Sequence, residues 1–244
     1  MSLEELRERR AFECRLTPDR ALGSLDAAEA FLLDRGLLTR TADCALPSLF
    51  EACHEEPYAP ASPGFGQWPR TKFPWFGELG ARGYLVLGVH RGKSLLVTAE
   101  VAALLDPSCR SELERLGDDR LLRHLAEAGP SELEDLQLEL GLKPKELKAM
   151  RHPLERRGAL VSRSIVYEDP HRHTSVLSRW DQVVPESSEG GPEDAVVAGV
   201  RAAVVAPEDD LRRWFSWTLP DDLVDGLVAD GRLVRPEPGW LAAG

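Results

Sequence analysis

The sequence lacks any apolar segment long enough to cross a membrane, since charged residues interrupt every hydrophobic run before the roughly 20 residues that such a helix needs. Residues 1–20 are charged rather than apolar, so no secretory signal is predicted there. We therefore expect a cytoplasmic protein with no membrane partner, associated with the nucleoid if it binds DNA.

Cysteine is scarce as well. Cys14, Cys44, Cys53 and Cys109 show no C-x-x-C spacing, so reduced, partly buried thiols are expected rather than a disulfide framework. His54 follows Cys53, but no second pair of ligands accompanies them, and no metal site is predicted. A Gly-rich phosphate loop and a G-x-S-x-G elbow are absent too, so the sequence indicates neither a cofactor nor a familiar class of enzyme.

The chain has no overall excess of basic residues. Its net charge of −11 and pI near 5.1 count against a protein that coats nucleic acid non-specifically. Acidic residues are concentrated in three stretches, 127–139, 186–194 and 208–225, and basic residues lie mainly elsewhere. This segregation suits a molecule with one DNA-facing side, and it equally suits acidic surfaces that hold a basic protein partner.

The strongest structural signal lies midway along the chain. Ser131 and Glu134 have the spacing of a capping box, which predicts the start of a helix that Gly141 ends. Pro144 fits the first position of a second helix, and Gly158 ends it. The two predicted helices are therefore joined by a tight turn, as in a helix-turn-helix.

A two-stranded hairpin follows these helices. Residues 159–168 and 174–180 have the two-residue period of strands, and Asp169–His173 has the composition of a turn. Helix, turn, basic helix and hairpin is the order of a winged helix-turn-helix unit. Pro153 lies inside the second helix and removes a backbone donor, so a kink or an early end near His152 is expected.

The second helix and the hairpin are basic. Residues 141–179 hold nine Lys or Arg and four Asp or Glu, which leaves about +5 within an acidic chain. Such a helix fits the major groove, where cations meet phosphates and base edges, so double-stranded DNA is the predicted partner. Winged helices also dock onto proteins, and a protein-interaction scaffold is the alternative. The predicted DNA-binding residues are Lys143, Lys145, Lys148, Arg151, His152, Arg156, Arg172, His173, and, on an earlier hairpin, Arg91 and Lys93.

The same order of elements recurs before and after this stretch. A helix over 25–35 precedes a hairpin over 84–98, and helices over 207–217 and 220–230 precede a C-terminal hairpin, with 195–205 predicted as a helix or a buried strand. The predicted fold is thus α+β, built of tandem winged helix-turn-helix units. The divisions are a charged N-terminal arm at 1–22, a first unit with an aromatic loop at 23–106, a central unit at 107–185 and a third unit at 193–244.

Two connecting segments carry further expectations. Asp106-Pro107 is predicted to end a short helix over 99–105, and 111–128 is predicted as one helix leading into the central unit. The loop over 57–75 has five aromatic residues with two cations between them. Such residues stack on bases, but they also pin a long loop to a core, and we favour packing.

Several short segments within roughly residues 74–244 are similar to those of a known family: Arg91-Gly92-Lys93, 122–129, Leu140-Gly141-Leu142-Lys143, 154–158 and Arg179-Trp180-Asp181-Gln182. In these segments and in the order of its elements, the chain resembles the AlkZ-type winged-helix family. The resemblance implies tandem winged helices and association with DNA. Active members are DNA glycosylases that excise alkylated purines or unhook interstrand crosslinks.

Catalysis in that family relies on two glutamines in a Q-x-Q motif near the N-terminus. This chain has only Gln67, Gln137 and Gln182, and none of them is paired in this way. We therefore expect a DNA-binding relative of repair glycosylases without glycosylase activity, and no catalytic residue is assigned. The alternative is an active glycosylase in which a carboxylate replaces the amide, with Asp19, Asp26, Glu29 and Asp34 as the acids available.

Overall fold

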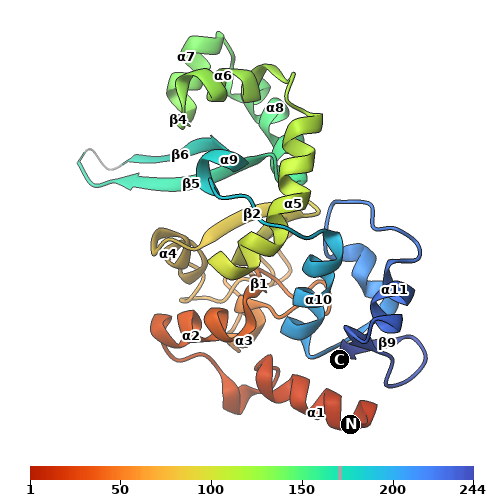
Figure 1. Cartoon of the computed structure of the whole chain (residues 1–244). Helices are drawn as coiled ribbons and strands as arrows, with labels where there is room; N and C mark the ends of the chain where they lie inside the picture. The colour runs from red at the N-terminus through yellow and green to blue at the C-terminus, as the bar shows by residue number, and fades with distance from the viewer. Residues whose placement is uncertain (170–171) are drawn as a thin grey trace.

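The computed structural model describes residues 1–169 and 172–244, so Pro170 and His171 of the predicted hairpin turn lie outside the described residues. The fold is α+β, as predicted, with short helices and three separate antiparallel sheets of three strands each. Helix α5 (Ala99–Arg115) runs between the groups of elements, and the middle of the chain lies at the top of Figure 1. Within the described ranges, no helix is both long and apolar enough to span a membrane.

The three groups, here called the first, central and third units, share one topology. A helix leads into a strand, helical segments follow, and a hairpin closes the unit, with the opening strand paired to the last one. The first unit contains α2 (Leu25–Arg35), β1 (Leu37–Thr39), α3 (Leu49–Ala52), α4 (Trp75–Ala81), β2 (Leu85–His90) and β3 (Lys93–Val97). The central unit contains α6 (Arg120–Ala128), β4 (Ser131–Glu132), α7 (Leu133–Leu140), α8 (Pro144–Arg157), β5 (Leu160–Tyr167) and β6 (Arg172–Arg179). The third unit contains α10 (Pro192–Ala203), β7 (Val205–Pro207), the 3-10 helix η2 (Glu208–Arg213), α11 (Leu223–Ala229), β8 (Leu233–Val234) and β9 (Trp240–Ala243).

The two helix ends predicted in the central unit are confirmed, whereas two other local signals are not. Gly141 and Gly158 end α7 and α8 in the left-handed conformation, with φ of 63° and 80°. The capping box was wrong: the Ser131 hydroxyl donates to the carbonyl of Gly129 at 2.9 Å, and Ser131 pairs with Leu177 in the sheet. Because β4 draws this residue into the ladder, α7 starts only at Leu133.

Of the kink or early end expected near His152, the early end was wrong, and the kink stays a prediction. Helix α8 continues through Pro153 to Arg157, where the buried side chain of Leu154 anchors it to the core. The proline leaves the carbonyl of Ala149 without its helical donor, but Ala149 lies on the exposed side, where water can replace that bond.

A second proline, Pro107, also fails to end a helix as predicted. The helix expected to end at Asp106-Pro107 runs on to Arg115, because Leu105, Cys109 and Leu113 bury its inner face along this whole length. The helix expected over 111–128 is instead broken, and α6 begins at Arg120 with the Asp119 carboxylate accepting the N–H of Leu121 at 2.8 Å. The predicted division between residues 106 and 107 therefore falls inside α5.

Asp106 is a buried ionic hub on α5. Its carboxylate accepts the indole N–H of Trp180 at 2.6 Å and the backbone N–H of Ser188 at 2.8 Å, and it pairs with Arg110 at 2.8 Å. Trp180 opens the short helix α9 (Trp180–Val183) and is itself fully buried. Asp106 thus ties α5 to the end of the central unit and to the segment that leads into α10.

The N-terminal segment is part of the structure rather than an arm. Helix α1 (Leu3–Glu13) buries Leu3 and Leu6 in a cluster with Val204 and Val205 of the third unit. A 3-10 turn, η1 (Pro18–Arg20), leads from it towards α2. The sequence did not predict this contact because the segment is mostly polar. Only two leucines, three residues apart, form its buried contact, and most of α1 faces solvent.

The elements predicted for residues 195–244 can be compared with those of the third unit. The apolar stretch over 195–205 is helical up to Ala203 and then enters β7, so both alternatives hold for part of it. The helix expected over 207–217 is only the short η2, and that over 220–230 is α11. The predicted C-terminal hairpin is formed by β8 and β9.

The aromatic loop packs on the first unit, as predicted. Trp68 and Phe73 lie against its core, and the rings of Trp68 and Phe50 are 5.5 Å apart, whereas Tyr58 and Phe65 stay exposed. The four cysteines are free thiols, as expected. Burial raises the pKa of Cys53 to about 12, so this thiol stays protonated at neutral pH.

Candidate nucleic-acid interface

Helix α8 is held in place by local caps and by two buried leucines. The N–H of Lys143 donates to the Glu146 carboxylate at 2.7 Å, and Pro144 occupies the first helical position. Leu147 and Leu154 point into the core, so the opposite side of the helix is available to solvent.

The outward face of α8 carries cations. Lys145, Lys148, His152 and Arg156 follow one another at intervals of three or four residues, which places them on one side of an α-helix, and all four are exposed. Lys143 is exposed just before the helix begins. Among the described residues, the side chains of Lys143, Lys145 and Lys148 have no carboxylate partner, whereas most arginines of the chain do.

The C-terminal half of α8 is partly covered by the first unit. A Cβ on Gly88 of β2 would lie 3.0 Å from the carbonyl oxygen of Glu155, so the strand and the helix approach closely there. Burial against this strand raises the pKa of Glu155. Arg151, predicted to contact DNA, is drawn into the same contact: its side chain is half-buried, 4.0 Å from Glu155, and its Nη1 atom has no hydrogen-bond partner. The accessible part of the predicted helix is therefore mainly its N-terminal half.

The predicted wing presents fewer free cations than the sequence indicated. Arg172 pairs with Glu132 at 3.0 Å and also with Glu134, because β4 and α7 bring these acids beside the hairpin. His173 is exposed on β6. Arg163, which the sequence reading passed over, is exposed on β5 with no ion pair in the described part of the chain.

The turn of the first unit's hairpin, which lies between Arg91 and Lys93, meets α8. Arg91 is exposed in the turn, and a Cβ on the neighbouring Gly92 would lie 3.1 Å from the side chain of Arg156. This contact brings the turn that carries Arg91 to the C-terminal end of α8. Lys93 instead pairs with Asp43, which the loop after β1 places beside it.

A hollow of about 640 Å³ separates the central hairpin from the first unit. Arg40 and Arg163 line it together with Ser162, Ser164 and Gln182, and no acidic residue of the described chain contributes to its wall. Arg40 is half-buried, its Nε has no hydrogen-bond partner, and its guanidinium lies 4.7 Å from the ring centroid of Phe76. Burial lowers the pKa of Arg40, and an anion would offset that cost better than the apolar wall does.

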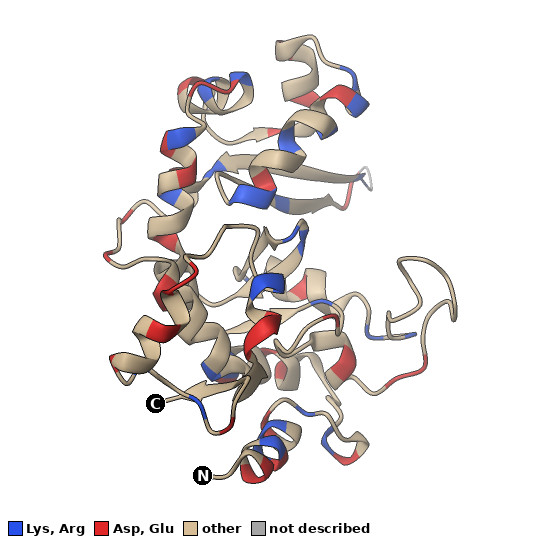
Figure 2. Ribbon diagram, turned by 90° about the vertical axis from the view of Figure 1, so that its right-hand side faces the viewer, with Lys and Arg blue, Asp and Glu red and all other residues tan. Residues whose placement is uncertain are grey.

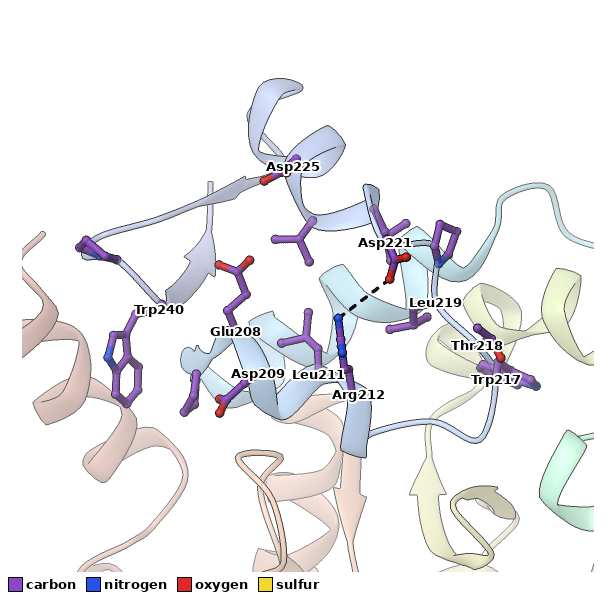
Figure 3. A pocket seen from close by; sticks show the side chains of 16 residues that line it. Glu208, Asp209, Leu211, Arg212, Trp217, Thr218, Leu219, Asp221, Asp225 and Trp240 are labelled. Carbon is purple, nitrogen blue, oxygen red and sulfur yellow. Dashed lines mark ion pairs between the residues drawn. The ribbon is translucent and has the colours of Figure 1, made fainter.

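Another hollow, in the third unit, is lined by more acidic than basic side chains. It measures about 910 Å³, and Figure 3 shows the side chains of Glu208, Asp209, Asp221 and Asp225 around it, with Arg212 paired to Asp221 at 3.9 Å. This surface would repel a phosphate backbone. Cations and acids both occur on the upper helices in Figure 2. Basic and acidic residues are therefore not separated between whole units, and a basic surface can only be the face of a single helix.

No family model, curated protein or solved structure matches this chain. The resemblance to AlkZ-type proteins therefore remains a prediction based on the residues quoted above. The acids considered as substitutes for the catalytic amides lie on the surface: Asp26 and Glu29 both pair with Arg82, and Asp34 pairs with Arg35. Asp181, which belongs to the segment Arg179-Trp180-Asp181-Gln182 quoted above, is paired with Arg179 at 2.6 Å.

Proposed function

We propose that the three units are winged helices and that the protein binds duplex DNA through the open face of α8. The shared order of helix, strand, helical segments and hairpin, with the opening strand paired to the last, supports the first part. Helices α7 and α8 then form the helix-turn-helix of the central unit, and α8 takes the position of its recognition helix.

One observation carries the DNA-binding proposal. Lys143, Lys145 and Lys148 are exposed on the N-terminal half of α8 without an acidic partner in the described chain. Recognition helices of this type contact base edges with their N-terminal residues. Because these lysines form no ion pair that DNA would have to break, binding a phosphate costs them no existing interaction. The Coulomb attraction and the release of counterions from DNA then both favour binding.

Two more groups extend this face. His152 lies between the lysines and Arg156, and the turn that carries the exposed Arg91 approaches Arg156 through Gly92. Contacts of this kind are blind to base sequence and weaken with salt, so we expect binding of weak to moderate affinity that falls steadily as ionic strength rises.

A titration of the chain against labelled duplexes of several sequences, followed by fluorescence anisotropy at several salt concentrations, tests the proposal. The variants K145E and K148E should each weaken binding by on the order of tenfold for every sequence and lower the slope of log affinity against log salt by about 1. The matched control is R201E, which makes the same change of charge at an exposed, unpaired cation of α10 in the third unit.

Two results would contradict the assignment. If K145E and K148E bind like R201E, α8 does not face the duplex. If the unaltered chain shows no salt-dependent shift at all, and a pull-down recovers a protein partner instead, the scaffold interpretation is correct and the DNA proposal is wrong.

We also propose that the chain does not excise bases. Cleavage of a glycosidic bond needs a free polar group beside C1′ of a flipped nucleotide. Gln182 is not free, since its Nε2 donates to the carbonyl of Leu125 at 2.6 Å and its Oε1 accepts the N–H of Arg179 at 3.0 Å. Asp26 and Asp34 belong to surface ion pairs.

The expected result is no release of alkylated purine from damaged duplex above the buffer rate. Released bases are measured by chromatography after incubation with the purified chain, beside a double variant D26A/D34A. Release by the unaltered chain that disappears in the double variant would show a carboxylate-dependent glycosylase and overturn this proposal.

A further inference from the structure

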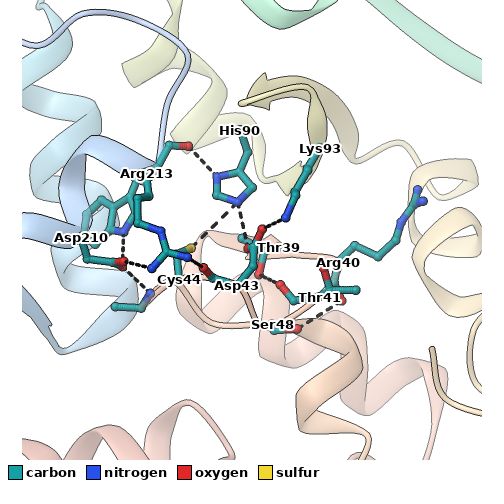
Figure 4. Close-up of polar contacts among 12 residues, drawn as sticks. Thr39, Arg40, Thr41, Asp43, Cys44, Ser48, His90, Lys93, Asp210 and Arg213 are labelled. Atoms are coloured by element: carbon teal, nitrogen blue, oxygen red, sulfur yellow. Dashed lines mark hydrogen bonds and ion pairs between the residues drawn. The ribbon is translucent and has the colours of Figure 1, made fainter. Parts of the chain in front are cut away.

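A second polar cluster lies away from α8, where the first unit meets the third. Asp43 and Cys44 belong to the loop after β1, and His90 is the last residue of β2 (Figure 4). His90 Nε2 lies 3.1 Å from Asp43 Oδ1 and 3.9 Å from Cys44 Sγ. One ligand atom from each of the three residues lies within 4.8 Å of the other two.

The tautomer of His90 is set by its other nitrogen. Nδ1 lies 2.6 Å from the carbonyl oxygen of Trp214, and because a carbonyl only accepts, Nδ1 must carry a hydrogen. In the neutral ring, Nε2 then presents a lone pair towards the Asp43 carboxylate, which also only accepts. Two acceptors this close repel each other unless a positive species joins them. That species is either a second proton on the imidazole, which makes Nε2 a donor, or a metal ion bound by both atoms.

The geometry fits a metal ion. In a tetrahedral zinc site with ordinary bond lengths, nitrogen and oxygen ligands lie about 3.3 Å apart, and nitrogen and sulfur ligands about 3.6 Å apart. The two separations from His90 Nε2 differ from these values by about 0.3 Å or less. A histidine that donates its remaining N–H to a backbone carbonyl is also the usual outer-shell arrangement of metal-ligating imidazoles.

We propose that Asp43, Cys44 and His90 bind a zinc ion. The donor set of one carboxylate oxygen, one sulfur and one imidazole nitrogen is of the kind that zinc prefers over magnesium or calcium. His90 is 2% exposed, so the imidazole is held without freedom to turn away. The sequence did not predict this cluster, because His90 lies 46 residues after Cys44 and meets Asp43 and Cys44 only through the packing of β2 on the loop after β1.

The surroundings complete the site. Lys93 binds Asp43 Oδ2 and leaves Oδ1 for the metal, and Arg213 donates to the carbonyl of Asp43, so the loop is fixed from two sides. A cavity of about 290 Å³ adjoins the ligands and is lined by Asp43, His90, Arg91, Lys93 and Arg213. The fourth position therefore opens towards cationic groups, and water or a small anion completes the coordination.

Zinc at this place would join two units. Asp43, Cys44 and His90 belong to the first unit, while Trp214 and Arg213, which hold His90 and Asp43, belong to the third. Close by, the N–H of Ser216 also donates to the carbonyl of Val89 at 2.7 Å. The ion would hold the end of β2 against the third unit.

The test uses the full chain without an affinity tag, stripped with a chelator and then titrated with zinc in competition with a chromophoric chelator. We expect a single equivalent to bind and to raise the thermal midpoint of unfolding. C44S should weaken binding by at least about tenfold, whereas C53S, which alters a buried thiol whose Sγ donates to the Leu49 carbonyl, should bind zinc like the unaltered chain.

Cobalt adds a readout of the ligand itself. Cobalt bound in place of zinc should give a thiolate-to-metal charge-transfer absorption that D43N retains in weakened form and C44S loses. Failure of the unaltered chain to take up zinc, or equal zinc binding by C44S and C53S, would overturn the proposal. The imidazolium–carboxylate pair would then account for the geometry.

Discussion

Replacing Asp106 by alanine is expected to lower the free energy of unfolding by about 3–5 kcal/mol, measured by urea denaturation. The carboxylate is fully buried and is the shared acceptor of the Trp180 indole, the Ser188 N–H and the Arg110 guanidinium. Its removal leaves a buried indole N–H and a largely buried cation without their partner, and each such loss is costly in a low-dielectric interior.

Two comparisons separate this effect from the loss of any carboxylate. D106N keeps an acceptor oxygen for Trp180 but loses the charge that faces Arg110, so its loss should be smaller than that of D106A. D26A removes an exposed partner of Arg82 and should cost at most about 1 kcal/mol. Equal losses for D106A and D26A would show that Asp106 is not a structural hub.

Replacing Gly158 by alanine is expected to cost about 3 kcal/mol of unfolding free energy. Gly158 has φ of 80°, and a Cβ there would lie 2.5 Å from Cys109 Sγ and 3.1 Å from Val89. The left-handed backbone costs an L-residue about 1–2 kcal/mol, and overpacking in a filled core costs about 1–3 kcal/mol more.

Gly141 provides the matched control. It ends α7 with φ of 63°, but nothing lies within 4 Å of its would-be Cβ, so G141A should show the conformational cost alone, about 1 kcal/mol. In the background of C109A, which removes the sulfur, G158A should become markedly less costly, as a double-mutant cycle measures. Strict additivity of the two substitutions would mean that the helix end does not pack on Cys109.

Segments whose structure depends on neighbours a few residues away could be predicted from the sequence. The bounds of α2, the helix ends at Gly141 and Gly158, and the hairpin of β5 and β6 follow from periodicity and from glycine's access to positive φ. The exposure of Lys145 and Lys148 is of the same kind, because Leu147 and Leu154 set the buried side of the helix.

What the sequence could not supply depends on which units pack together. Pro107 continues a helix because distant residues bury α5. Lys93 and Arg172 form ion pairs with acids from other segments of the chain, and Arg151 lies beside Glu155 on the covered side of α8. The same packing places His90 against Cys44, 46 residues earlier in the chain. It also places Arg40 in the wall of a hollow to which no acidic residue of the described chain contributes. Local pattern determines which residues lie on one helix face or strand edge, whereas pairing, burial and cavities are properties of the assembled core, where contacts between distant segments outweigh local preference.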